Sequence, residues 1–582
     1  MTSSAPDAAA CQARWADAIT AALVDAGVTE VIVGPGSRST PLVLAVARRE
    51  GLRLTWVIDE RSAAFVALGQ ARATGRPSAL LVTSGTAGAH AFPAVVEAGV
   101  AFLPLIVITA NRPPALQGCG ASQTVEQTRL FGDHARRFVV LGPPRDDDDA
   151  RTAVRRQVVQ LVQAARAPSP GAVHLDAAFD KPLEPPAGWQ VSEPVGASTR
   201  AFAPRRLIAD TEALREVAAV LATARRPLIV CGPAIGAQAG LAASVAALAK
   251  RLDAPVYAES ASGLRFADGV VAGADALGWL AAAAPWLAPD VVVQLGASPV
   301  LGAWEKIVRA ARPRRIVIAE HGWPDPTSDA AVLLQSEPTW ALDALAHAFD
   351  AKLAPHPFGR QLATASAAVW RAVEAILSDA PLAEATVARA VRAHAAGRTL
   401  LVGNSLPVRH LDAWVPSGGP TVRVHAQRGA AGIDGLISAA AGVAALGEPT
   451  TLLLGDVSFL HDVGALAVAA RLPRAPLTIV VVDNGGGRIF DELPLAGHAD
   501  AAAVRDAFTT PHGLALDVIA RGFGLDAVRV EDTPSLTRAL ERATDGTRVI
   551  VCATPAERTR AMAAAVLARA TAEIHAALGP SA

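Results

Sequence analysis

The chain has 582 residues, of which 51% are hydrophobic and 18% are charged, and its formal net charge at pH 7 is −1. This length and composition predict a globular protein of several domains with sizeable apolar cores. The nearly balanced charge excludes the strongly basic surface on which nucleic-acid and anionic-membrane binding depend.

The first third of the chain alternates short apolar strands with helices. Helical spacing runs over residues 15–26, and later helices are expected at 63–74 and around Pro93. The predicted strands are residues 31–33, 55–58, 78–82 and 105–110. Each of them ends in a polar or glycine-rich cluster, at 34–40, 59–60, 83–86 and 111–114 respectively. Alternation of this kind predicts a parallel sheet with helices on both faces, and the clusters then line one crevice at the carboxyl ends of the strands.

The middle of the chain predicts a second α/β unit between two boundaries. Residues 183–204 are rich in proline and glycine and are expected to be a linker, and a second boundary is expected at 355–358. The strands between them are predicted at 227–230, 291–296 and 315–319. This unit lacks a complete GxGxxG with a downstream acid, so we expect a scaffold rather than a nucleotide site.

The last third contains a β-α-β crossover. One apolar strand, 452–454, ends in Gly455-Asp456, and a second, 477–482, ends in Asp483-Asn484, with an alanine-rich helix expected at 463–472. A crossover makes the two strands parallel neighbours, so a carboxylate, an amide oxygen and the Gly486 carbonyl meet at one edge. Mg²⁺ prefers such oxygen ligands when a diphosphate completes its octahedron. An ordinary β-α-β unit with a polar loop is the alternative. A final helix is predicted from Ala556.

Several motifs together carry a resemblance to a known family. They are PGSRSTP (35–41), DER (59–61), TSGTA (83–87), NRPP (111–114), GNS (403–405), QRGAAGIDG (427–435) and the pair Asp456 and Asn484, 484 − 456 = 28 positions apart. The chain resembles the thiamin-diphosphate (ThDP) enzymes, and among them the branch that makes 2-succinyl-5-enolpyruvyl-6-hydroxy-3-cyclohexene-1-carboxylate in menaquinone biosynthesis. The resemblance covers the first and last thirds and is thin in the middle.

The resemblance implies an architecture and an assembly. It implies three Rossmann-like α/β domains with mostly parallel sheets: a pyrimidine-binding domain at 1–188, a central domain at 200–355 and a diphosphate-binding domain at 360–582. It also implies a homodimer or homotetramer in which the first domain of one subunit completes the cofactor site of its partner.

The resemblance also implies the cofactor site. Glu60 is expected to hydrogen-bond the pyrimidine N1′ of ThDP and relay a proton, the alternative being a solvated acid at a helix start. Ile433 is expected to support the bent cofactor, the alternative being an ordinary core residue. The other expected cofactor contacts are Ser84, Gly85, Thr86, Gly455, Val457, Ser458, Ile489 and Phe490. Asp456, Asn484 and Gly486 are the expected ligands of Mg²⁺ or Mn²⁺.

The implied substrates are 2-oxoglutarate and isochorismate, both dicarboxylates. The resemblance implies decarboxylation of the first and 1,4-addition of the resulting succinic semialdehyde carbanion to the second, a carboligase-type transferase reaction. Fixed arginines suit carboxylates because the guanidinium fork is bidentate and stays charged. The arginines at the family positions are Arg38, Arg112, Arg409 and Arg428, with surface ion pairs as the alternative. Ser37, Gln123 and Ser405 would add neutral hydrogen bonds, and Leu493 would add wall.

The sequence departs from the family pattern at several positions. Val457 stands for a glycine, Asp483 for the first asparagine of the metal motif, and Ser122 for an asparagine before Gln123. Segment 296–303 lacks the Lys or Arg that family members often carry, and Lys306 follows it. His90, His134 and His461 could enter the pocket, although surface or structural roles are favoured.

Two other functions remain open at this point. Another ThDP carboligase or 2-oxoacid decarboxylase would use pyruvate-like substrates and fewer pocket arginines. A non-catalytic protein with a decayed ThDP fold would be expected to lose Glu60 or Asp456, and both are present.

Cysteine usage and the start of the chain bear on location. The four cysteines, Cys11, Cys119, Cys231 and Cys552, form neither a CxxC pair nor a metal-ligand spacing, which is typical of a reducing compartment. The N-terminus has no basic segment followed by an apolar core, and charged residues or prolines interrupt each apolar stretch before bilayer length. We therefore expect a cytoplasmic protein without a membrane span.

Overall fold

The computed structural model describes residues 5–191, 206–233, 240–269, 273–348, 356–498, 500 and 504–579. The chain divides into two compact units, each with contributions from distant parts of the sequence. The first unit comprises residues 1–205, 427–447 and 461–474. The second comprises residues 206–426, 448–460 and 475–582.

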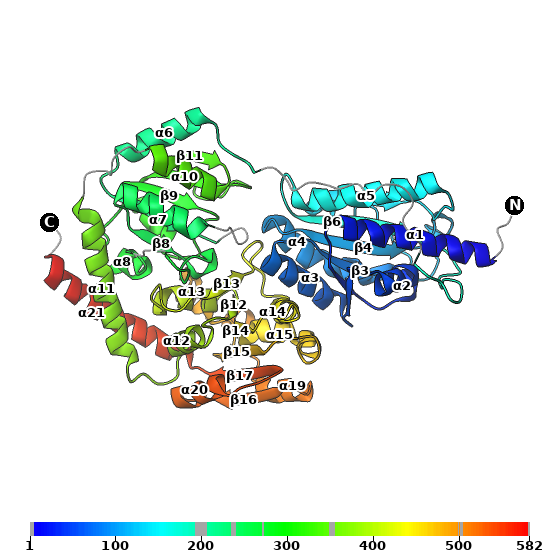
Figure 1. The fold of residues 1–582 in the computed structure, drawn as a ribbon. Helices are drawn as coiled ribbons and strands as arrows, with labels where there is room; N and C mark the ends of the chain where they lie inside the picture. The colour runs from blue at the N-terminus through cyan, green and yellow to red at the C-terminus, as the bar shows by residue number, and fades with distance from the viewer. Residues whose placement is uncertain are drawn as a thin grey trace. The chain divides into compact units, whose positions relative to one another are not determined.

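The first unit holds a six-stranded sheet in which every neighbouring pair is parallel, in the order β2-β1-β3-β4-β6-β5. Its strands are β1 (Glu30–Val33), β2 (Arg53–Trp56), β3 (Ser78–Val82), β4 (Leu105–Asn111), β5 (Arg137–Leu141) and β6 (Ala172–Ala178). One face carries α1 (Ala5–Asp25), α2 (Thr40–Arg48) and α5 (Asp148–Arg166), and Figure 1 shows α1 beside α5. Alternate strand residues point to the other face, where α3 (Glu60–Thr74) and α4 (Phe92–Val100) lie.

Helix α14 (Leu436–Ala444) packs closely against α3 within this unit. A Cβ placed on Gly69 of α3 would lie 2.4 Å from the Ala439 carbonyl oxygen. A Cβ placed on Gly442 of α14 would lie 2.5 Å from the Val66 carbonyl oxygen. The two backbones therefore approach to a distance that only glycine permits at these positions.

The second unit begins with a five-stranded parallel sheet in the order β11-β10-β9-β7-β8. Its strands are β7 (Pro227–Cys231), β8 (Val256–Ala258), β9 (Val291–Leu295), β10 (Arg314–Ala319) and β11 (Ala330–Gln335). One face carries α6 (Thr211–Ala222), α7 (Leu241–Leu252) and α10 (Pro338–Ala348). The other carries α8 (Leu277–Ala283), α9 (Trp304–Ala311), α11 (Pro357–Leu377) and α21 (Ala556–Leu578). Residues 192–204 of the predicted linker and Pro355 of the second boundary lie outside the described residues.

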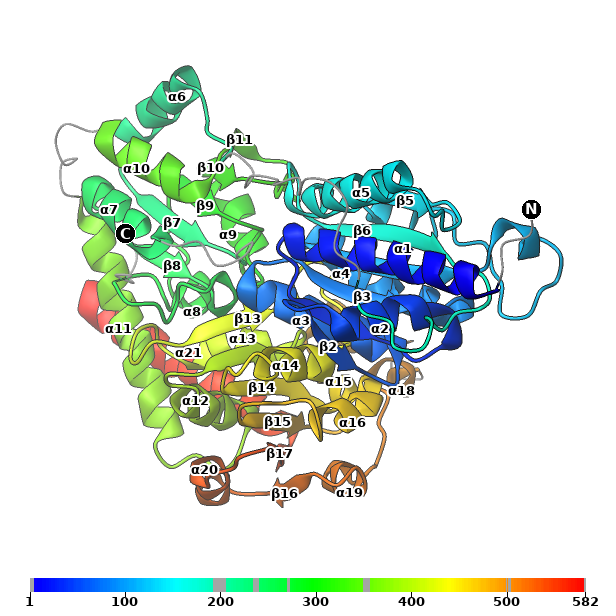
Figure 2. The ribbon, with the colours of Figure 1, turned by 45° about the vertical axis from the view of Figure 1, so that its right-hand side comes forward.

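The second unit also holds a six-stranded parallel sheet in the order β13-β12-β14-β15-β17-β16, and Figure 2 shows β14, β15, β17 and β16 in this succession. Its strands are β12 (Thr399–Val402), β13 (Arg423–Ala426), β14 (Thr450–Gly455), β15 (Leu477–Asp483), β16 (Asp526–Val530) and β17 (Thr547–Ala553). Helices α12 (Glu384–His394), α13 (Leu406–Trp414) and α20 (Thr533–Glu541) share one apolar core with it. The short helices α18 (Arg505–Thr509) and α19 (Leu516–Gly522) follow β15 in the chain.

The expected helix at 463–472 is only partly right. The chain forms α15 (Asp456–His461), a 3₁₀ turn (Val463–Ala465) and the short α16 (Leu466–Ala469). Asp462 separates them because its backbone leaves the helical region while its buried carboxylate accepts a hydrogen bond from the Ser438 N–H at 2.9 Å. Asp456 is therefore the first residue of a helix rather than part of a loop.

The predicted α/β class with mostly parallel sheets is confirmed. The three domain ranges stay a prediction, with one sheet inside each range. Helix α21 is long and apolar enough to cross a membrane by length and composition alone. Only 17% of this apolar window is buried, and its buried residues Val566, Ala570 and Ile574 pack in a core with α11.

Candidate active site

The adjacent carboxyl ends of β14 and β15 bring the predicted metal ligands of the second unit together. Asp456 is buried, and its two carboxylate oxygens accept from the backbone N–H groups of Val457 and Gly486, each at 2.7 Å. Asn484 donates its amide N–H to Glu384 at 2.5 Å. The Asn484 Oδ1 is buried and has no hydrogen-bond partner among the residues that the structure describes.

These groups fit a hard divalent cation. A buried amide oxygen without a partner costs free energy unless a donor or an ion satisfies it. Gly486 has φ +125°, and a Cβ there would lie 2.1 Å from the Thr509 carbonyl oxygen, so this loop requires glycine. The Gly486 carbonyl accepts from the Arg488 N–H at 2.8 Å and has a second lone pair for an ion. Carboxylate, amide and backbone oxygens form the donor set that Mg²⁺ or Mn²⁺ takes beside a diphosphate.

His512 is a residue of this site that the sequence analysis missed. Its Nε2 lies 3.2 Å from the Asp456 carboxylate and 3.9 Å from that of Asp483. The three side chains place their potential ligand atoms within 4.8 Å of one another. Burial raises the pKa of Asp456 above its usual value. No sequence signal links His512 to the strand ends, because the segment after α18 reaches them only through the fold.

A buried glutamate and a buried histidine lie behind the predicted metal ligands. Glu384, the first residue of α12, is 3% exposed, and burial raises the pKa of its carboxyl to about 7. His410 of α13 places Nε2 3.6 Å from the second oxygen of Glu384, and burial lowers the pKa of this histidine to about 4. Glu384 precedes Asn484 by 100 positions, so local patterns gave no indication of the contact.

Ser405 and Arg409 stand at the start of α13. Ser405 adopts φ +69°, which is uncommon for a non-glycine residue, and its carbonyl accepts from the Arg409 guanidinium at 2.6 Å. Strain of this kind is found at functional sites when the surroundings hold it in place. Ser405 and Arg409, the predicted substrate residues of the second unit, are therefore linked by a hydrogen bond at the start of α13.

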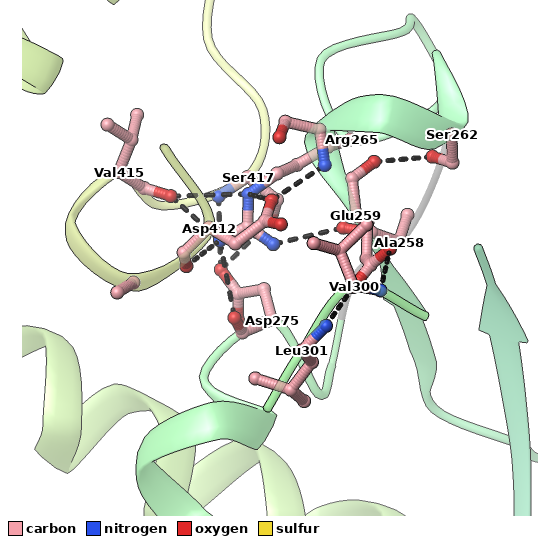
Figure 3. Close-up of polar contacts among 12 residues, drawn as sticks. Ala258, Glu259, Ser262, Arg265, Asp275, Val300, Leu301, Asp412, Val415 and Ser417 are labelled. Atoms are coloured by element: carbon pink, nitrogen blue, oxygen red, sulfur yellow. Dashed lines mark hydrogen bonds and ion pairs between the residues drawn. The ribbon is translucent and has the colours of Figure 1, made fainter. Parts of the chain in front are cut away.

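The network in Figure 3 holds α13 in the second unit. The buried Arg265 donates to the backbone carbonyls of Ala258 (3.0 Å), Asp275 (3.3 Å), Asp412 (2.9 Å) and Val415 (2.7 Å). Asp412, on α13, accepts from the Ser260 N–H at 2.7 Å. These bonds tie α13 to the loop after β8.

The loop after β8 also binds segment 296–303, which departs from the family pattern. Glu259 is fully buried and accepts from the backbone N–H groups of Val300 and Leu301 at 2.9 and 2.8 Å. Lys306, the basic residue closest after this segment, is exposed and lines a groove of about 350 Å³ between α8 and α9. The groove is otherwise apolar along most of its length, so Lys306 does not restore a buried cation to segment 296–303.

In the first unit, Glu60 lies at the start of α3 and is half-buried. A Cβ on Gly34 would lie 2.8 Å from the Glu60 Cγ, so the glycine at the end of β1 leaves room for this carboxylate. The next glycine, Gly36, packs against Thr83 at the end of β3, where an added Cβ would lie 2.2 Å from the Thr83 Cβ. The GSRSTP, DER and TSGTA motifs are thus neighbours at one edge of the sheet.

Two predicted arginines of this unit have unused donor capacity. Arg38 is 2% exposed and donates to the Phe179 carbonyl at 2.7 Å, while its Nε–H has no partner in the described part of the chain. The buried Nε of Arg112 is likewise without a partner there. Gln123 adopts φ +55° and donates to the Ser84 carbonyl at 3.1 Å, beside Gly85.

Glu97 positions the loop that carries Arg428 and Ile433. This buried carboxylate pairs with Arg72 at 2.7 Å and accepts from the backbone N–H groups of Gly429 and Ala430 at 3.0 and 2.7 Å. All of these residues belong to the first unit. The sequence analysis missed Glu97, which lies inside α4 more than 300 positions before the loop.

The remaining predicted residues occupy the same two strand edges. Ser84, Gly85 and Ser458 are buried, Gly455, Val457, Ile433, Ile489 and Phe490 are half-buried, and Ser37, Thr86 and Leu493 are exposed. His90, His134 and His461 are all exposed. The structure thus groups the predicted residues in two sets, one in each compact unit.

Comparison with known proteins identifies the family. Residues 13–130 match the family model described as "Thiamine pyrophosphate enzyme, N-terminal TPP binding domain", and residues 419–553 match the corresponding C-terminal TPP binding domain. The relatives include proteins named 2-succinyl-5-enolpyruvyl-6-hydroxy-3-cyclohexene-1-carboxylate synthase. The protein of Sorangium cellulosum is 45% identical over 90% of this chain and 90% of its own. The proteins of Myxococcus xanthus and Halobacterium salinarum are 39% and 38% identical, over 91% and 93% of this chain and 92% and 95% of their own. This chain therefore belongs to the 2-succinyl-5-enolpyruvyl-6-hydroxy-3-cyclohexene-1-carboxylate synthase family of thiamine pyrophosphate enzymes.

Proposed function

We propose that this protein decarboxylates 2-oxoglutarate and adds the resulting four-carbon unit to isochorismate in a 1,4 sense, releasing CO₂, as a ThDP-dependent enzyme of menaquinone biosynthesis. The observation that carries the proposal is the meeting of Asp456, Asn484 and Gly486 at adjacent strand ends, with one buried amide oxygen left for an ion. When bound, ThDP supplies the electron sink that makes decarboxylation and carbon-carbon bond formation possible.

Asp456, Asn484 and Gly486 would hold Mg²⁺ or Mn²⁺ through three oxygen atoms. Gly455, Val457 and Ser458 at the start of α15 would lie beside the diphosphate, since a helix start favours anions. Ile433, Ile489 and Phe490 would supply apolar contacts to the cofactor. Removal of the metal by a chelator should abolish turnover, and Mg²⁺ or Mn²⁺ should restore it.

Glu60 would hold a proton at N1′ of the cofactor pyrimidine. Glu60 is half-buried, and its side chain lies beside Gly34, the residue that follows β1. Ser84, Gly85 and Thr86 would line the same part of the site. Proton transfer by a positioned side chain contributes about 10²–10⁴-fold to rate.

The substrate carboxylates would be bound by arginines. The unpaired Nε–H groups of Arg38 and Arg112 can each donate to a carboxylate without breaking a bond that the protein already makes. Arg409 and Arg428 would contribute the remaining positive charge, and Gln123 and Ser405 neutral hydrogen bonds. A charge-assisted hydrogen bond contributes about 1.5–3 kcal/mol, so two for each carboxylate can offset its desolvation.

The assembly and location are part of the proposal. We propose a homodimer or homotetramer, which size-exclusion chromatography with light scattering would distinguish from a monomer. We also propose a cytoplasmic location, which the four unpaired cysteines support.

The test is an assay of isochorismate absorbance in a mixture of enzyme, 2-oxoglutarate, isochorismate, ThDP and Mg²⁺. Consumption should require every component. Glu60→Gln should lower turnover about 10²–10⁴-fold with ThDP saturating. Asp148→Asn, which changes the exposed first residue of α5, should leave it unchanged. Full turnover by Glu60→Gln, or decarboxylation of pyruvate in place of 2-oxoglutarate, would overturn the proposal.

A further inference from the structure

The orientation of one amide group decides whether Asn484 can bind a cation. The amide presents an oxygen on one side and an NH₂ group on the other, and only the oxygen has lone pairs for a metal. Rotation of the side chain by half a turn about its last bond would direct two N–H donors at the ion. Some neighbouring group must therefore select the orientation in which Oδ1 remains available.

Glu384 is placed to make this selection. Its Oε1 lies 2.5 Å from the Asn484 Nδ2. When Oε1 is a hydrogen-bond acceptor, only the NH₂ side of the Asn484 amide can donate to it. The opposite orientation would bring Oδ1 against a carboxyl oxygen, two acceptors without a proton between them. This selection holds for the ionised carboxylate and for the acid whose proton is on Oε2, because Oε1 is then an acceptor.

The surroundings restrict the Glu384 side chain. It is the first residue of α12 and is 3% exposed, so its side chain has little freedom. Its second oxygen lies 3.6 Å from His410 Nε2, on the helix that also carries Arg409. Partners of this kind behind a metal ligand orient the ligand and raise its affinity for the metal.

We propose that Glu384 is a positioning residue of the metal site, which fixes the Asn484 amide with its oxygen toward the divalent cation. The inference rests on the metal site proposed above and concerns a residue outside the metal ligands themselves. It connects α12 to the cation through Asn484, whereas the sequence motif contains only the residues at the strand ends.

The test measures the affinity for Mn²⁺ in the presence of saturating ThDP, from the electron paramagnetic resonance signal of free Mn²⁺. Glu384→Ala should weaken Mn²⁺ binding by about 10–100-fold. Glu384→Gln should weaken it less, because Gln still offers an oxygen but can also present its NH₂ group. Glu337→Gln is the matched control: Glu337 is 8% exposed and accepts from the N–H groups of Thr339 and Trp340 at the start of α10. This variant should bind Mn²⁺ as the wild type does.

A double variant tests orientation apart from stability. Asn484→Asp alone would place two carboxyl groups against each other and should bind Mn²⁺ weakly. Adding Glu384→Gln lets the Gln NH₂ donate to one Asp oxygen and leaves the other for the ion, so affinity should return to within about 10-fold of the wild type. A purely structural role for Glu384 would not give this recovery.

The outcomes separate this inference from the proposed metal site. Absence of ThDP-dependent Mn²⁺ binding by the wild-type protein would overturn the metal site and the inference with it. Wild-type binding together with equal binding by Glu384→Ala would overturn the inference alone. Failure of the double variant to recover affinity, in a protein whose metal-free unfolding temperature matches that of the wild type, would overturn it as well.

Discussion

His174 is a fully buried histidine on β6, in the core of the first unit. Its Nε2 lies 2.8 Å from the Thr109 hydroxyl, and its ring centroid lies 4.9 Å from that of Phe131 and 5.0 Å from that of Phe138. Burial lowers the pKa of His174 from the usual 6.5 to about 4, because the surroundings disfavour the charged ring.

This shift predicts a loss of stability in acid. The unfolded chain binds a proton at His174 below pH 6.5 and the folded chain only below about pH 4, so the contribution is complete above 6.5 and is lost as the pH falls from 6.5 to 4. The shift of 6.5 − 4 = 2.5 corresponds to about 3 kcal/mol of unfolding free energy. Urea unfolding at pH 7.5 and pH 4.5 should show a smaller difference for His174→Gln than for the wild type.

The matched control is the exposed His498. His498→Gln should keep the wild-type difference between the two pH values. An unchanged pH dependence in His174→Gln would mean that the buried ring does not resist protonation.

Site residues differ in how far the sequence predicts them. Asp456 and Asn484 could be identified because each follows an apolar run, and parallel strands bring their carboxyl ends together. Glu384 and Glu97 could not be identified, because each is a charged residue of a helix and the sequence around it is ordinary. Their roles depend on contacts with loops that are distant in the sequence.

The contact between α3 and α14 depends on glycine residues in both helices. Gly442→Ala would place a Cβ 2.5 Å from the Val66 carbonyl oxygen, which belongs to the backbone and cannot rotate away. We expect a loss of about 1–3 kcal/mol in unfolding free energy, despite the better helix propensity of alanine. Thermal unfolding of the variant would measure it.

Gly522→Ala in α19 is the control for helix propensity. No atom lies within 4 Å of a Cβ placed there, so alanine should leave stability unchanged or raise it by up to about 1 kcal/mol. Equal stability of Gly442→Ala and Gly522→Ala would show that α14 can move away from α3 at no cost.

Helix α13 depends on Arg265 for its place. Arg265→Leu would leave four backbone carbonyls without their donor and Asp412 without its nearest cation, at 3.9 Å. Breaking a buried charged network from one side costs about 3–5 kcal/mol. The unfolding temperature of Arg265→Leu should therefore fall well below that of Arg309→Leu, whose guanidinium is exposed and pairs only with Glu305 in the described chain. Similar unfolding temperatures would contradict this role.

Elements were predicted best where an apolar run is bounded by polar residues on both sides. The predicted strand at 78–82 coincides with β3, whose five residues are all buried. Helix α1 begins at Ala5, well before the predicted Trp15, because an alanine-rich start has high helix propensity but no apolar periodicity to detect. The helix expected at 463–472 could not be corrected from sequence, because the interruption at Asp462 depends on a contact with Ser438, 24 positions earlier in the chain.

Binding of ThDP and metal should stabilise the whole molecule. A ligand that binds only the folded state adds about 2.7 kcal/mol at one hundred times its dissociation constant. Scanning calorimetry with ThDP and Mg²⁺ should show an upward shift in unfolding temperature, and excess chelator should remove it. A shift that survives in Asn484→Ala at the same concentrations would contradict the proposed metal ligands.

The course of the chain through the two compact units has a practical consequence. After β13 the chain gives residues 427–447 to the first unit, returns to form β14, and gives residues 461–474 before β15. No single proteolytic nick can release an intact unit. A truncated protein that ends at residue 205 would lack α14 and would expose the surface of α3 around Gly69 against which α14 packs. We expect this exposed surface to cause self-association, and the addition of residues 427–447 to prevent it.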